Sequence, residues 1–276
     1  MTGLGLPVVA ALVLLWLSQS VAERIPWFEA ARWDLLSYGV QRRAWELSGI
    51  LGGAVGMLLL GVLDDKHELR PASKFAGQFL IASLVAASGV RVSLFIPVTA
   101  LHFAVTIFWI LSVINAFNFM DNMNGLCAGL GAIGAWYFAT VAAGDGQYLV
   151  ALLAFLAFGA LIGFLPYNFP RARAFLGDAG SHLVGYLLAV LAILPHFYSE
   201  RNPHRWAVFI PLVVLAVPLA DMAWVIVLRW RKRQPFYVGD TNHLSHRLVR
   251  LGLSRPWAVV WIWLGAVMIG ALAYFL

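Results

Sequence analysis

The chain has 276 residues, of which 62% are hydrophobic and only 12% are charged. A soluble domain carries roughly twice that charged fraction and needs polar side chains to cover its surface, so the composition excludes an ordinary soluble protein and indicates a surface that faces lipid. The net charge of +6 indicates basic cytoplasmic loops. Without interleaved basic and aromatic residues, we expect no nucleic-acid partner. A single cysteine, Cys127, excludes an intrachain disulfide and a Cys-x-x-Cys site.

Apolar runs long enough to cross a bilayer recur along the whole chain. A helical span needs about 17–25 such residues, and none of the runs contains Lys or Arg. The first run lacks the basic start and the Ala-x-Ala-type end of a signal peptide, so we count it as a helix. We predict an all-α, polytopic membrane protein of about nine transmembrane helices in a single domain, residues 1–276. The runs are 4–20, 47–63, 75–90, 95–114, 124–143, 147–165, 180–197, 206–228 and 257–275.

The connections between these runs differ in basic content when they are taken alternately. The connections 64–74, 115–123, 166–179 and 229–256 hold 12 Lys and Arg residues, and the connections 21–46, 91–94, 144–146 and 198–205 hold 7. Because basic residues stay on the cytoplasmic side, we expect the first set there and the protein in the bacterial inner (plasma) membrane. The four arginines of 21–46 are unusual for an outer connection, and the aromatic residues beside them indicate an interfacial amphipathic segment.

The four predicted cytoplasmic connections hold nearly all the unusual polar residues, which suggests one active site. In the first, Asp64 and Asp65 end a predicted helix. Successive helical residues point about 100° apart, so one carboxylate can face a site while the other bonds to a neighbour such as Lys66 or Lys74. The helix macrodipole disfavours acids at this end, which indicates a functional reason. A solvated helix end explains the pair equally well.

The second connection carries Asn115, Asn118, Asp121 and Asn124 at steps of three residues. If the stretch is helical, these side chains form one polar stripe. Asparagine both donates and accepts hydrogen bonds, which suits a nucleobase edge or a metal ion shared with phosphate. The alternative is a helix cap followed by a turn, since Asn-Gly pairs are common in turns.

The third connection ends in Gly177-Asp178-Ala179-Gly180-Ser181, directly before a predicted helix. Glycine lets a backbone approach a ligand closely, and a helix N-terminus favours anions such as phosphate. Asp178 could hold Mg²⁺ against that phosphate. A plain capping role for Asp178 or Ser181 stays open.

The fourth connection carries His243, His246 and Arg247. Histidines at helical spacing can bind zinc, but no cysteine lies near them, and a guanidinium beside the pair suits a diphosphate better. Asp221 lies inside the predicted span 206–228. A charge at that depth is costly and usually faces the interior of a helix bundle, so Asp221 is either a site residue or a contact between helices.

These four clusters, in this order and at the ends of helices, resemble the polyprenyl-phosphate N-acetylhexosamine-1-phosphate transferases, also called glycosyltransferase family 4. The resemblance covers roughly residues 47–276. It implies transfer of a sugar-1-phosphate from a UDP-sugar to polyprenyl (undecaprenyl) phosphate, with release of UMP, as a first membrane step of cell-envelope polysaccharide synthesis. It also implies Mg²⁺ as the cofactor, with Mn²⁺ as an alternative, membrane lipid around the protein, and a homodimer.

The resemblance assigns a role to each cluster. The aspartate pair matches the positions that orient or deprotonate the lipid phosphate, and an aromatic residue three before Asp178 matches one that stacks on uracil. The expected catalytic residues are Asp64, Asp65, Asp178, His243 and His246. The expected substrate-binding residues are Lys74, Asn115, Asn118, Asp121, Asn124, Phe175 and Arg247. The expected metal ligands are Asp178 and Asn118.

Three departures from the family pattern stand out. Asn124 occupies a place that usually holds aspartate, as in the eukaryotic branch, and Ser245 stands where many members have a further histidine. Residues 1–46 lack the basic loop rich in proline and glycine that usually precedes the aspartate pair. We therefore keep two alternatives: a transporter or flippase for an anionic or lipid-linked solute, and a catalytically silent relative.

Overall fold

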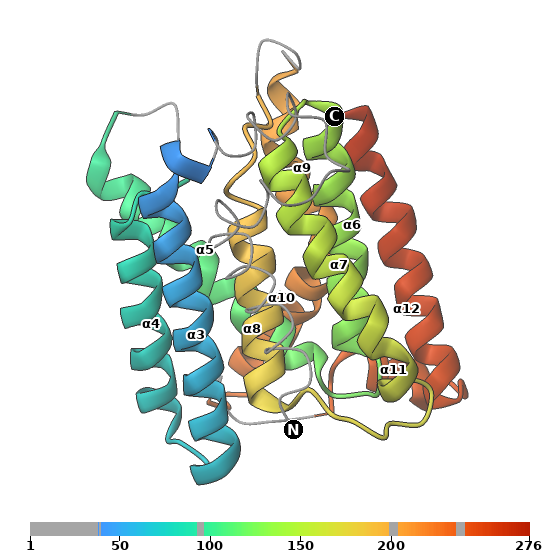
Figure 1. The fold of residues 1–276 in the computed structure, drawn as a ribbon. Helices are drawn as coiled ribbons and strands as arrows, with labels where there is room; N and C mark the ends of the chain where they lie inside the picture. Colours follow the sequence, from blue (N-terminus) through green and yellow to red (C-terminus); the bar gives the residue numbers. More distant parts are fainter. Residues whose placement is uncertain (1–37, 39, 93–96, 199–203, 236–240) are drawn as a thin grey trace.

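The computed structural model describes residues 38, 40–92, 97–198, 204–235 and 241–276, and within these ranges the chain forms helices and no strand (Figure 1). The predicted all-α class is confirmed. The long helices are α3 (Ala44–His67), α4 (Pro71–Ala87), α5 (Thr99–Met120), α6 (Leu126–Gly144), α7 (Tyr148–Asn168), α8 (Gly177–Leu191), α10 (Ala216–Arg231) and α12 (Arg255–Gly270). The short ones are η2 (Arg205–Phe209), α9 (Ile210–Val214), α11 (Leu244–Arg250) and η3 (Ala271–Phe275).

Several of these helices are long and apolar enough to cross a membrane. In the part of the chain that the structure describes, five meet that requirement, or six if the bent pair η2/α9 and α10 is one span. With 17 residues, α4 is at the lower limit of a span, and α8, with 15, is shorter. The predicted first span at 4–20 lies outside the described residues. A polytopic membrane protein is therefore confirmed, while the predicted number of nine spans is not.

The outer surface of the helix bundle is apolar. Large hydrophobic side chains lie exposed on helices all around the bundle, among them Leu80 on α4, Phe108 on α5 and Met268 on α12. In water such a surface would cause association, because soluble monomers rarely expose large contiguous apolar patches. The exposed side chains fit a lipid environment, which agrees with the composition.

Helix α8 lies at the centre of the bundle, and every residue from Ala179 to Leu191 is buried. It packs against α3 and α5. Glycines at these contacts have no side chain, so the helix backbones lie close together. A Cβ atom at Gly61 of α3 would lie 2.3 Å from the Cα of Ala179, and one at Gly185 would lie 2.7 Å from the Cα of Ile114. Gly61 therefore allows the first turn of α8 to approach the end of α3 closely, and Gly185 allows α8 to approach α5.

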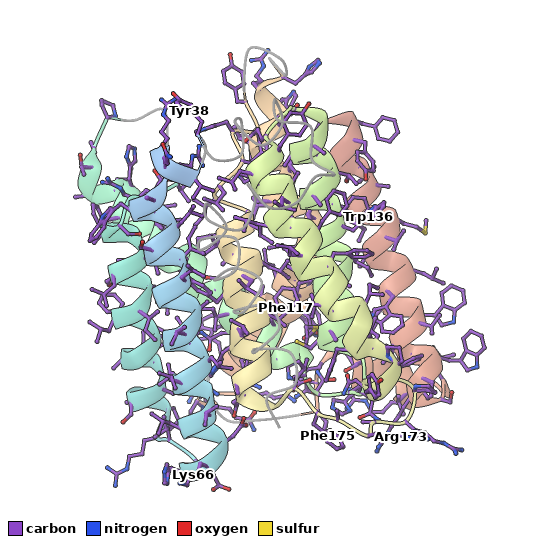
Figure 2. The ribbon with its side chains drawn as sticks, in the orientation of Figure 1. Tyr38, Lys66, Phe117, Trp136, Arg173 and Phe175 are labelled. Carbon is purple, nitrogen blue, oxygen red and sulfur yellow. The ribbon has the colours of Figure 1, made fainter. Side chains whose placement is uncertain are left out.

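The polar connections gather at one end of the molecule. Figure 2 shows Lys66, Arg173 and Phe175 at the lower end of the view and Tyr38 at the upper end. The end of α5 and the start of α11 are joined by a hydrogen bond from Ser245 Oγ to Asn122 Oδ1 at 2.6 Å. The prediction that the four polar connections share one face is thus supported by these contacts.

The predicted continuous span 206–228 is wrong in detail, because the helix is broken. The two halves meet at Leu215 with a bend of 69°. Pro218 explains the break: it has no N–H to donate to the carbonyl of Val214, and its ring clashes with that carbonyl in a continuous helix. As a result α10 leaves the break in a new direction and carries Asp221 and Arg229.

Candidate functional site

Two carboxylates from distant parts of the chain share one ammonium group. Nζ of Lys74, on α4, lies 2.6 Å from Oδ2 of Asp64 at the end of α3 and 3.1 Å from Oδ1 of Asp178 at the start of α8. The other oxygen of Asp64 accepts a hydrogen bond from the backbone N–H of Leu69 at 2.9 Å. Asp64 is buried, so an unpaired charge there would be costly. The predicted pairing of the aspartate cluster with Lys74 is confirmed.

Asp65 caps the first turn of α8 from another helix. Its two carboxylate oxygens accept hydrogen bonds from the backbone N–H groups of Asp178 (2.8 Å) and Ala179 (3.2 Å). These N–H groups have no partner inside the helix, and the helix dipole favours a negative charge at this place. Gly177 makes the turn with φ of +63°, and a Cβ atom there would lie 2.7 Å from Asp65 Oδ2. The sequence left a capping role for Asp178 or Ser181 open, and in the structure Asp65 supplies a cap to this turn.

The predicted polar stripe is helical only in its first half. Helix α5 ends at Met120, so Asn115 and Asn118 lie on the helix, whereas Asp121 and Asn124 lie in the turn that follows. Nδ2 of Asn118 donates hydrogen bonds to Asp178 Oδ1 and, at 3.0 Å, to Ser181 Oγ. Asn118 and Asp178, both predicted metal ligands, are thus in direct contact.

The turn after α5 is stabilised by contacts with the connection after α7. Gly125 has φ of +79°, and its N–H donates to Oδ1 of Asn168 at 2.7 Å. Asn124 Nδ2 donates to the carbonyl of Pro170 at 3.4 Å. The pKa of Asp121 is raised to about 7, mainly by burial and to a smaller extent by the carboxylates of Asp178 and Asp65. The turn therefore presents a carboxyl group that is partly protonated at neutral pH.

The fourth cluster is built around a buried pair. Nδ1 of His243 lies 2.6 Å from Oδ2 of Asp221, and Oδ1 of Asp221 accepts a hydrogen bond from the N–H of Leu244, also at 2.6 Å. Both side chains of the pair are buried. Asp221 is therefore a contact between helices that fixes the start of α11, which was one of the two interpretations left open by the sequence.

Both halves of the site meet at the end of α5. Asn118 faces Asp178 on one side, and the ring of the next residue, Phe119, lies edge-on against His243 at 5.5 Å between centroids. The guanidinium of Arg229 lies 5.1 Å from the centroid of the same Phe119 ring. The end of α5 therefore contacts both Asp178 and His243, two of the predicted catalytic residues. The hydrogen bonds of these two residues belong to separate networks.

Three of the predicted residues are placed without a contact to the acidic cluster. Phe175 is 66% exposed and lies at the same end as Lys66 (Figure 2), which leaves its face accessible for stacking. Arg247 lies over the Trp224 ring at 5.1 Å. The pKa of His246 is lowered by partial burial and, in second place, by the neighbouring His243.

Sequence reasoning gave no role in this cluster to two buried residues that lie beside it. Gln78 and His182 are both fully buried, and Nε2 of Gln78 lies 3.2 Å from Nε2 of His182. Gln78 follows Lys74 by one helical turn on α4. A glutamine inside an apolar run was the signal that could have revealed it, because a polar side chain at membrane depth needs a partner.

The acidic cluster has the donor atoms that a hard divalent cation prefers. Ligand atoms of Asp64, Asp178 and His182 lie within 4.8 Å of one another, and Lys74 Nζ stands in for a cation between the two carboxylates. Mg²⁺ typically takes one or two carboxylates together with phosphate oxygens, so the two aspartates fit it. Asn118 turns its Nδ2 toward Asp178, which leaves Oδ1 as the atom of that side chain able to bind a cation.

Acids, amides and a buried Asp–His pair gather at one end of a multi-helix membrane protein, and such side chains can bind a divalent cation and phosphate oxygens. The chain belongs to glycosyl transferase family 4, whose model matches residues 47–196. The matched part contains the acidic and amide clusters, and the histidine cluster lies beyond it.

Curated relatives extend the similarity beyond the matched part. The chain is 33% identical over 226 residues to a probable undecaprenyl-phosphate N-acetylglucosaminyl 1-phosphate transferase of Bacillus subtilis, an alignment that covers 79% of this chain. It is 34% identical over 252 residues to decaprenyl-phosphate N-acetylglucosaminephosphotransferase of Mycobacterium tuberculosis, which covers 80% of this chain. It is 25% identical over 236 residues, 78% of this chain, to an Escherichia coli undecaprenyl-phosphate alpha-N-acetylglucosaminyl 1-phosphate transferase. The chain spans 62% of the length of each of these relatives.

Proposed function

We propose that this protein transfers a sugar-1-phosphate, of the N-acetylhexosamine type, from a UDP-sugar to polyprenyl phosphate and releases UMP. The observation that carries the proposal is the sharing of Lys74 by Asp64 and Asp178, whose helices are far apart in sequence. The names of the relatives, which are N-acetylglucosamine 1-phosphate transferases acting on undecaprenyl or decaprenyl phosphate, support the choice of reaction.

The reaction joins two anions, so the site has to reduce their repulsion. In phosphoryl transfer, catalysis is mostly positioning and stabilisation of charge. Mg²⁺, held by Asp64 and Asp178 with Oδ1 of Asn118, would supply positive charge between the two phosphates. Lys74 lies beside both carboxylates and is placed to contact a phosphate oxygen. The lipid phosphate attacks the phosphorus next to the sugar, and the bond to UMP breaks.

The surrounding residues bind and orient the two substrates in this proposal. The turn with Asp121 and Asn124 and the exposed ring of Phe175 take the nucleotide, the ring by stacking on the base. His243, kept in place by Asp221, contacts the sugar or the diphosphate together with His246 and Arg247. All of these residues lie at one end of an apolar bundle, where a lipid phosphate can reach them from the membrane surface.

We infer that this end faces the cytoplasm of a bacterial inner membrane. The connections at this end carry the larger share of the basic residues, which is typical of the cytoplasmic side. UDP-sugars are soluble nucleotides, so the proposed reaction also requires that side.

The test is an assay of the purified protein with undecaprenyl phosphate and a panel of UDP-sugars, with UMP as the measured product. We expect UMP release that depends on Mg²⁺ or Mn²⁺ and falls by at least about 10²-fold in Asp178→Asn, because loss of a positioned charge in the transition state typically costs that much. Glu68→Gln is the control, since Glu68 is an exposed carboxylate in the connection after α3, and its contact with the cluster is a backbone hydrogen bond to the Asp64 carbonyl that the substitution leaves in place.

The other two functions predict different results in the same preparation. A transporter would take up solute into vesicles without releasing UMP, and a silent relative would bind the nucleotide without turnover. A transporter needs polar side chains near the bilayer midplane, whereas Asp221 fixes His243 and the start of α11, which favours the transferase. Full UMP release by Asp178→Asn would refute the assigned cluster.

A further inference from the structure

Two amide side chains, the half-buried Asn115 and the buried Gln78, connect the backbone of α5 with His182. Asn115 Nδ2 donates to the carbonyl of Leu111 at 2.8 Å and to Oε1 of Gln78 at 2.9 Å, and Nε2 of Gln78 lies 3.2 Å from Nε2 of His182. The Nδ1 atom of His182 is buried and has no hydrogen-bond partner among the described residues. The proposed reaction does not use this chain, so its purpose requires an explanation.

The carbonyl of Leu111 determines the direction of every hydrogen bond in the chain. A backbone carbonyl only accepts, so the Asn115 atom beside it is the Nδ2 donor. The same Nδ2 faces Gln78, so the Gln78 atom that it meets is the Oε1 acceptor. The remaining Gln78 atom, Nε2, is therefore a donor toward His182. Turning both amides over would place Oδ1 of Asn115 at 2.8 Å from the Leu111 oxygen, with two acceptors in contact.

The tautomer of His182 follows from this direction. A ring nitrogen that accepts a hydrogen bond carries no proton, and in a neutral imidazole the other nitrogen then carries it. Nε2 of His182 is the acceptor, so the proton is on Nδ1. His182 thus presents a buried N–H donor, and one of its ring nitrogens lies within 4.8 Å of carboxylate oxygens of Asp64 and Asp178.

We propose that Asn115 and Gln78 are positioning residues that hold His182 as the Nδ1–H tautomer, so that His182 donates a hydrogen bond to an oxygen of the bound phosphate and does not bind the cation. This inference rests on the proposed function for the identity of the phosphate. Histidines that bind metals usually donate their second N–H to a carbonyl or carboxylate. Here the second nitrogen meets an amide donor, which is the opposite arrangement.

A consequence concerns the choice of metal ion. If His182 is a donor, the protein atoms that hold the cation are oxygens from Asp64, Asp178 and Asn118. Oxygen sites suit Mg²⁺ and Mn²⁺, whereas imidazole favours zinc and other late transition metals. The amide chain would therefore prevent the three-residue group of Asp64, Asp178 and His182 from becoming a zinc site, although its spacing allows one.

Nitrogen-15 NMR of the full chain, labelled at its seven histidines, tests the tautomer directly. His182→Gln identifies the His182 signals by their disappearance. In the unmodified protein we expect His182 to have a protonated Nδ1 and an unprotonated Nε2. The measurement requires neither a bound ligand nor enzyme activity. In Gln78→Glu the carboxylate accepts in place of the amide donor, so Nε2 is expected to become protonated. A protonated Nε2 in the unmodified protein would overturn the proposal, even if Gln78→Glu fails to fold.

Electron spin-echo measurements on Mn²⁺-loaded protein test the second part. Direct binding of an imidazole nitrogen to Mn²⁺ produces a nitrogen-14 modulation, and we expect none from His182, so that the spectrum is the same in His182→Gln. A modulation that is lost in His182→Gln would refute the donor role. If Mn²⁺ does not bind at all, the proposed cation site fails, while the NMR result still decides the tautomer.

Discussion

Replacing Asp65 separates a positioning role from a catalytic one. In Asp65→Ala, the N–H groups of Asp178 and Ala179 lose acceptors at 2.8 and 3.2 Å. Loss of a helix cap costs about 0.5–2 kcal/mol and loss of a favourable charge at a helix N-terminus about 0.3–1 kcal/mol, so we expect about 1–3 kcal/mol in total. For a chain of this size, that corresponds to a fall in melting temperature of roughly 2–12 °C.

The effect on turnover is expected to be modest, because the Asp178 side chain keeps its contacts with Lys74 and Asn118. For Asp65→Ala we expect a fall of about tenfold in the rate of UMP release, which corresponds to about 1.4 kcal/mol in the activation free energy. Removal of a general base would lower the rate by roughly 10²–10⁴-fold. The assay compares UMP release and thermal unfolding in detergent for Asp65→Ala, Asp65→Asn and the Glu68→Gln control. An unchanged melting temperature together with a loss above about 10²-fold would show that Asp65 acts in the chemistry and that the capping argument is wrong.

Three further substitutions test other parts of the fold and the site. Gly61→Ala places a Cβ atom 2.3 Å from the Ala179 backbone, whereas a Cβ atom at Gly52 on the same helix meets nothing within 4 Å. In thermal unfolding we therefore expect Gly61→Ala to lose about 1–3 kcal/mol of stability and the control Gly52→Ala to lose none of it. Asp221→Asn weakens the charge-assisted hydrogen bond to His243, and such bonds contribute about 1.5–3 kcal/mol. UMP release should therefore fall roughly 10–100-fold, and the pH profile of UMP release should shift. An unchanged pH profile would contradict the positioning role of Asp221. Because the raised pKa of Asp121, about 7 against 3.8, means that the folded state binds the proton more tightly, its contribution to stability is lost as pH rises from about 4 to 7. Asp121→Asn should therefore reduce the loss of melting temperature between pH 5 and pH 8 in the metal-free protein, and an equal loss in both proteins would refute the burial argument.

The sequence predicted the membrane class and the convergence of distant clusters well, because both depend on composition and order along the chain. Apolar runs follow directly from the thickness of a bilayer. The partner of Asp64 could be proposed because Lys74 lies one short connection away. The predicted spans failed where local chemistry overrides hydrophobicity, as at Pro218, whose missing donor divides an apolar run that looks continuous.

The details of the site depended on packing and could not be predicted. Nothing near Asp65 in the chain shows that its carboxylate caps a helix more than a hundred residues away. The role of Gln78 depends on α4 and α8 both packing against α3 and α5, which brings Gln78 to His182. The histidine cluster was found from its residue types, but its attachment to Asp221 through Nδ1 of His243 required the bend that redirects α10.

The ammonium of Lys74 also bears on the sequence in which binding partners arrive. Two carboxylates and one ammonium leave a single excess negative charge in the trio of Asp64, Lys74 and Asp178. A phosphate that enters by itself meets repulsion, and a divalent ion reverses the sign of the local field. Kinetic experiments that vary the order of addition should therefore reveal a compulsory sequence, with the metal ion ahead of the nucleotide.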